Sequence, residues 1–104
     1  MELEKRLEEW LTGIFEDDPL PDEVKFIYFV IVDEKVSYHL EIRGSEIKNT
    51  TYFEYYPLEA QYFFYDYPIL KEDFIIQLSL ALKNLPILED RQVYILSNGK
   101  LHDV

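Results

Sequence analysis

The sequence predicts one α+β domain, in which two helices cover one face of an antiparallel sheet of about five to six strands. Two segments have the 3.6-residue apolar period of helices, and the segments between and after them have the two-residue period of strands. The 104 residues suit one hydrophobic core, and 48% of them are hydrophobic. We therefore expect residues 1–104 to form a single domain with the element order α-β-β-β-(β)-α-β-β.

The first expected helix covers residues 2–16. Its large apolar side chains fall on one stripe of a helical surface and are Leu3, Leu7, Trp10, Leu11, Ile14 and Phe15. The two prolines and two aspartates of residues 17–21 end it.

An antiparallel hairpin is expected next. Residues 24–32 are apolar on both faces, as in an interior strand that is covered on both sides. Residues 36–43 alternate between apolar and polar side chains, which predicts one buried and one solvated face. A short turn at Asp33 and Glu34 joins the two strands.

The later elements follow from turn and stop signals. After a loop at residues 44–49, residues 50–56 and 60–66 are expected to form two further strands, or one strand with a bulge. Residues 69–84 have a second helical stripe that Pro86 ends. Asn98-Gly99 predicts a closing hairpin of residues 92–97 and 100–104.

Charge limits the classes of partner. The net charge is −11, and residues 1–23 alone carry nine acids against two basic residues. Such a surface repels nucleic acid and anionic membranes, so we expect neither as a direct partner. The longest apolar run, residues 26–32, is too short to span a bilayer, and the acidic start is unlike a secretory signal. We expect a cytoplasmic protein.

The sequence offers little for catalysis. It has no cysteine, which excludes thiol nucleophiles and thiolate metal sites. His39 shares a strand face with Glu41, but two ligands make a weak metal site, and His102 is close to the end of the sequence. Glu72 and Asp73 could act as acid and base, yet the first turn of a helix favours anions for structural reasons alone. We therefore expect no enzyme activity, cofactor or metal.

The acids after the first helix are more informative. Glu16, Asp17 and Asp18 follow carbonyl groups that are already partly negative, which costs about 0.3–1 kcal/mol each at low salt. Asp22 and Glu23 add to the repulsion. An unfavourable local charge of this kind indicates a surface kept for a partner, while the alternative is an acidic loop that only aids solubility.

A second candidate surface is aromatic. Nine aromatic residues lie between positions 52 and 67, and the tyrosines among them are Tyr52, Tyr55, Tyr56, Tyr62, Tyr65 and Tyr67. Because they fall on both faces of the expected strands, some should reach solvent, where tyrosine is a favoured contact residue. Glu54 and Asp66 lie among them. The alternative is that a helix or a second subunit covers this face.

Together these features predict a non-catalytic binding protein for a basic protein target. The predicted partner-binding residues are Glu16, Asp17, Asp18, Asp22, Glu23, Tyr52, Glu54, Tyr55, Tyr56, Tyr62, Tyr65, Asp66 and Tyr67. Carboxylates can replace phosphates, and phenol rings can replace stacked bases, so the target would be a nuclease or another nucleic-acid-binding protein. In general composition the chain is similar to immunity proteins and phage DNA mimics, without a shared motif. The alternative is a homodimeric escort protein, similar in topology to type III secretion chaperones but without their C-terminal helix.

Overall fold

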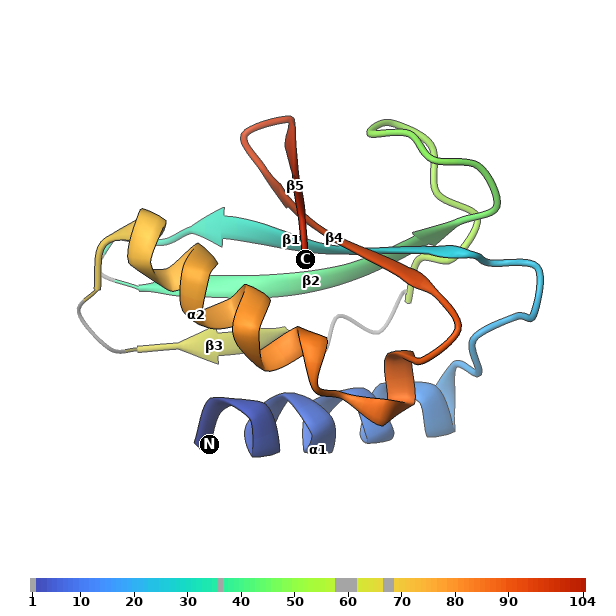
Figure 1. Ribbon diagram of the computed structural model, residues 1–104, viewed down its shortest axis with the longest axis horizontal. Helices are drawn as coiled ribbons and strands as arrows, with labels where there is room; N and C mark the ends of the chain where they lie inside the picture. The colour runs from blue at the N-terminus through green and yellow to red at the C-terminus, as the bar shows by residue number, and fades with distance from the viewer. Residues whose placement is uncertain (1, 36, 58–61, 67–68) are drawn as a thin grey trace.

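The computed structural model describes residues 2–35, 37–57, 62–66 and 69–104, which form an α+β fold around one five-stranded mixed sheet (Figure 1). The strand order is β3-β2-β1-β4-β5. Neither α-helix is long and apolar enough to cross a membrane. The elements in chain order are α1 (Glu2–Asp17), β1 (Phe26–Asp33), β2 (Tyr38–Ser45), β3 (Phe63–Tyr65), α2 (Lys71–Lys83), a short 3₁₀ helix η1 (Pro86–Leu88), β4 (Gln92–Ser97) and β5 (Lys100–Asp103).

The expectation of a purely antiparallel sheet was wrong, because β4 runs parallel to β1. Both β3 and β4 run in the direction of β1, because β2 is antiparallel to β1 and to β3. The chain passes from β3 through α2 to β4. A helical crossover of this kind is the connection that parallel strands require. The strand β4 is placed beside β1 rather than beside β3. As the sequence predicted, β1 is an interior strand, and the side chains of both Tyr28 and Phe29 are fully buried.

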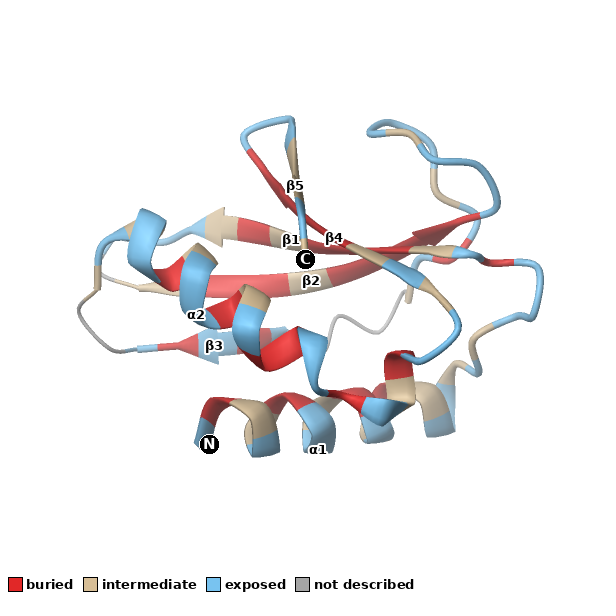
Figure 2. Ribbon diagram, viewed as in Figure 1, coloured by how far each residue is buried: buried red, intermediate tan, exposed pale blue. Residues whose placement is uncertain are grey.

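The two helices cover the same face of the sheet and bury the main hydrophobic core against it (Figures 1 and 2). Trp10 of α1 contacts Phe29 of β1 and Phe63 of β3, with ring centroids 6.2 and 5.4 Å apart. On α2, Phe74 is stacked on Tyr65 of β3 at 4.6 Å. The apolar stripes that the sequence predicted for both helices therefore face the strands.

The opposite face of the sheet is polar and aromatic. Tyr28 and Tyr94 are neighbours across the parallel β1–β4 pair, with ring centroids 5.9 Å apart. On β2, His39 and Arg43 are both buried on this side, so the solvated face that the sequence predicted for this strand was wrong. This face therefore carries charged and hydrogen-bonded side chains, whereas the helix-covered face carries the aliphatic and aromatic side chains of the core.

The closing hairpin was predicted correctly and the strand at 50–56 was not. Asn98 and Gly99 both have positive φ, as the tight turn between β4 and β5 requires. Residues 50–56 form no ladder and make only an isolated bridge between Tyr55 and Gly44. The side chain of Asn49 accepts hydrogen bonds from nearby backbone N–H groups, which competes with strand pairing.

Candidate partner-binding surface

The loop of residues 46–54 is built on the polar face of the sheet. The hydroxyl of Tyr28 forms a buried 2.7 Å hydrogen bond with Ser45 Oγ and accepts a 3.1 Å bond from the N–H of Asn49. The ring of Phe53 packs against Tyr28 with centroids 5.1 Å apart. One buried tyrosine thus fixes both ends of the loop.

Hydrogen bonds inside the loop set its shape. Asn49 Oδ1 accepts the N–H groups of Thr51 at 2.9 Å and Tyr52 at 2.6 Å. The Glu54 carboxylate accepts the N–H of Glu46, with the nearer oxygen at 3.2 Å. Binding residues on a loop that a rigid scaffold fixes lose little conformational entropy on association.

This hydrogen-bonded loop nevertheless exposes large apolar groups. Ile47 is 76% exposed and Tyr52 is 69% exposed. Burying them would have stabilised the fold, since an aliphatic side chain gains about 1.5–3 kcal/mol when it is fully buried. Their exposure therefore favours a role in recognition.

A shallow groove of about 800 Å³ runs between these side chains and the acidic segment that precedes β1. Three carboxylates face one ammonium group in it, and the Lys25 Nζ already donates a 2.6 Å hydrogen bond to the backbone carbonyl of Asp22. The groove is lined by Glu23, Lys25, Glu46, Ile47, Asn49, Tyr52 and Glu54, and we call it the acidic groove. It joins members of both predicted surfaces, the acids and the tyrosines.

Two side chains hold the acidic segment 17–23 beside the groove. Tyr55 donates a 2.6 Å hydrogen bond to the Asp18 carbonyl. Arg91 donates from Nε to the Val24 carbonyl at 2.9 Å and from Nη2 to the Pro21 carbonyl at 3.3 Å. The segment is therefore fixed to the sheet by its backbone, while the side chains of Asp22 and Glu23 are exposed.

Tyr55 was predicted to contact a partner, and this prediction was wrong because the residue is buried. It is only 6% exposed, and its backbone N–H and C=O both bond to Gly44, at 3.0 and 2.9 Å. Burial raises the pKa of Tyr55 to about 12, and the Asp18 carboxylate adds to the rise. Gly44 permits this close approach, because a Cβ there would lie 2.6 Å from Val24 Cγ1 and 3.1 Å from Tyr55 Cβ.

Tyr65 was also predicted to contact a partner, and this prediction was wrong because it too is buried. It is 8% exposed, because its ring stacks on Phe74 beneath α2 while its hydroxyl bonds to Gln77 at 3.2 Å. Tyr67 lies outside the described residues.

The other predicted contacts lie outside the acidic groove, and all of them except Asp18 are exposed. Tyr56, which is 52% exposed, covers the guanidinium of Arg43 at 3.6 Å, and Tyr62, which is 41% exposed, stacks on His39 at 4.5 Å. Glu16 lies on the outer face of α1, and Asp17 and Asp66 are exposed, while Asp18 is half-buried.

A charged network occupies the polar face of β2. His39 Nδ1 lies 2.6 Å from Glu34, and its Nε2 lies 2.9 Å from Glu41, whose other oxygen binds Arg43. Both histidine nitrogens can donate only in the imidazolium form. The described residues contain no group of three or more histidine or carboxylate side chains that could hold a metal ion.

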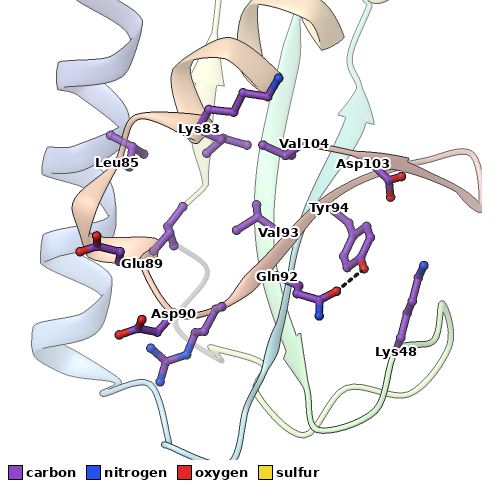
Figure 3. Close-up of a pocket in the computed structure, with 13 residues that line it drawn as sticks. Lys48, Lys83, Leu85, Glu89, Asp90, Gln92, Val93, Tyr94, Asp103 and Val104 are labelled. Atoms are coloured by element: carbon purple, nitrogen blue, oxygen red, sulfur yellow. Dashed lines mark hydrogen bonds between the residues drawn. The ribbon is translucent and has the colours of Figure 1, made fainter.

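A second hollow, of about 590 Å³, lies between the end of α2 and the strands β4 and β5 (Figure 3). Its charges are mixed, since Lys48 lies over the Tyr94 ring at 4.7 Å while Glu89 and Asp90 line the opposite end. Its Arg91 is already bonded to backbone carbonyls. Nothing in this hollow favours a ligand of one charge.

Comparisons with protein-family models, with curated proteins and with solved structures found no match. The suggested similarities to immunity proteins and to type III secretion chaperones therefore stay predictions.

Glu46 and Ile47 line the acidic groove but were not among the predicted contact residues. Both lie in the expected loop at 44–49, where Ile47 is the one aliphatic residue in a polar stretch. An isolated large apolar residue in such a loop was the available signal.

Proposed function

We propose that this protein is a non-catalytic binding protein whose acidic groove accepts a basic segment of a partner protein. The observation that carries the proposal is that Ile47 and Tyr52 are exposed between the carboxylates of Glu23, Glu46 and Glu54. The apolar groups supply contact area, and the carboxylates select arginine and lysine.

The chemistry of the groove supports a cationic side chain as its ligand. An arginine can place its guanidinium on the Tyr52 ring and pair with a carboxylate at the same time. The charge of −11 adds a long-range attraction that speeds association with a basic surface. Among the residues that the structure describes, Lys25 is the only cation that lines the groove, and its ammonium group already donates a hydrogen bond to the Asp22 carbonyl.

A basic surface of this kind is typical of proteins that bind nucleic acid. We therefore propose that the partner is a nuclease or a similar protein and that binding blocks its nucleic-acid-binding surface. The carboxylates of the groove would replace the phosphates that such a surface binds, and the Tyr52 ring would replace a stacked base.

The test is affinity capture from a cell lysate with three immobilised proteins. The groove variant carries Glu23→Gln, Glu46→Gln and Glu54→Gln. Its matched control carries Glu2→Gln, Glu8→Gln and Glu9→Gln on the exposed face of α1, which changes the net charge equally. We expect the parent and the control to retain the same basic nucleic-acid-binding protein and to release it as salt rises.

The groove variant should bind that protein about tenfold or more weakly, because three partly exposed ion pairs are worth roughly 0.5–1 kcal/mol each. Calorimetric titration of the purified partner measures this difference. Equal loss in both variants would mean that only the net charge acts, and equal affinity in all three proteins would contradict the proposal. A parent column that retains no basic protein would contradict it as well.

A further inference from the structure

The outer face of α2 carries an exposed stripe with charges at both ends. Ile76 is 59% exposed and Leu80 is 50% exposed, and they lie one turn apart on the side away from the core. Asp73 continues the stripe toward the start of the helix, and Lys83 continues it toward the end, and both are exposed. We call these four residues the α2 stripe.

The spacing of the α2 stripe makes it complementary to itself. The steps are three, four and three residues, which keeps all four side chains on one side of a helix. Two copies that pack antiparallel about the level of residue 78 place Ile76 against Leu80 of the other copy. The same arrangement brings Asp73 of each copy next to Lys83 of the other, about 15 Å from the opposite charged pair.

We propose that the α2 stripe is a homodimer interface in which two α2 helices pack antiparallel. Charge complementarity selects this occupant and this orientation, because parallel packing would place Asp73 against Asp73 and Lys83 against Lys83. Neither residue forms an ion pair with another residue that the structure describes. Figure 3 shows the Lys83 side chain pointing away from Glu89 and Asp90, so it is free to reach a second copy.

The association should be weak and should strengthen with salt. Four residues from each copy bury less surface than a standard interface, and each copy carries a charge of −11. Salt screens the repulsion between the copies over their whole surface, whereas only two ion pairs at the interface lose attraction. Binding to a basic partner has the opposite salt dependence, so this inference and the proposed function can fail separately.

Charge exchange tests the interface. Asp73→Lys and Lys83→Asp each place like charges opposite one another at both ends of the symmetric pair. Each variant alone should dimerise about tenfold or more weakly than the parent. An equimolar mixture of the two variants restores both attractive pairs and should form a heterodimer.

Sedimentation equilibrium from about 1 µM to about 1 mM protein measures all of these states. Glu8→Lys and Lys100→Asp are the matched controls, since they make the same charge changes at exposed positions away from α2. Circular dichroism shows whether each variant is folded. A parent that stays monomeric over the whole range would overturn the proposal, as would a mixture that behaves like its separate components. If both single variants dimerised like the parent, the interface would lie elsewhere.

Discussion

The acidic groove and the α2 stripe both expose large apolar side chains, but they differ in how charge surrounds those groups. In the groove, Glu23, Glu46 and Glu54 give one sign of charge around Ile47 and Tyr52. On α2, opposite charges stand at the two ends of the stripe, at Asp73 and Lys83. We propose that both surfaces are contact surfaces, and the arrangement of charge is what distinguishes the partners proposed for them.

The two surfaces also differ in how the fold supports them. The α2 stripe is part of a regular helix, whose opposite side is buried through Phe74 and Leu78. The groove depends on irregular backbone that is held by Tyr28, Tyr55 and the close approach at Gly44. Substitutions at these supporting residues should therefore disturb the groove and leave the α2 stripe intact.

Gly44→Ala should have the largest effect on stability. The added methyl group would lie 2.6 Å from Val24 Cγ1 and close to Tyr55, so one of these residues must move. We expect the free energy of unfolding to fall by about 1–3 kcal/mol. Chemical denaturation measures this, with Gly13→Ala in α1 as the matched control.

Gly13→Ala should instead raise the free energy of unfolding, since alanine is favoured over glycine within a helix by roughly 0.5–1 kcal/mol. If Gly44→Ala were as stable as the parent, the tight contact between β2 and Tyr55 would be contradicted.

Tyr55→Phe should have a smaller effect that depends on pH. The substitution removes the hydrogen bond to the Asp18 carbonyl, which is worth about 1 kcal/mol near neutral pH. The fold raises the pKa of Tyr55 from 10.0 to about 12, so it favours the neutral phenol. That contribution is complete below pH 10 and is lost as the pH rises through about 12. The parent should therefore lose its advantage over the variant across this interval.

Unfolding curves at about pH 7 and about pH 11 check this expectation. Tyr52→Phe is the matched control, because Tyr52 is 69% exposed, and it should leave stability unchanged at both pH values. A constant difference between the parent and Tyr55→Phe would mean that Tyr55 is not held neutral by burial.

Local patterns predicted the elements that depend on local physics. The stripes of α1 and α2, the interior strand β1 and the Asn98-Gly99 turn all follow from periodicity or turn chemistry. The solvated face expected for β2 was wrong, because Tyr56 lies over Arg43 and Tyr62 stacks on His39. Local patterns did not predict the parallel pairing of β1 and β4, because this pairing depends on the position in the sheet at which the chain enters β4 after α2.

The candidate site was predicted only in part. Glu23, Tyr52 and Glu54 lie together in the groove, as members of the two predicted surfaces. Tyr55 and Tyr65 are buried, because register decides which tyrosines face the core, and the sequence does not determine register in a short strand or an irregular segment. Glu46 was missed because its place in the groove depends on how the loop folds over Tyr28.

The most direct test of the central claim is an NMR titration of the isotope-labelled protein with a hexa-arginine peptide at low salt. The account predicts saturable shift changes at the backbone N–H groups of Glu23, Glu46, Tyr52 and Glu54, which vanish in the groove variant and persist in its α1 control. Shift changes spread evenly over all exposed acids, or concentrated on the outer face of α1, would contradict the claim that the groove is the cation-binding surface.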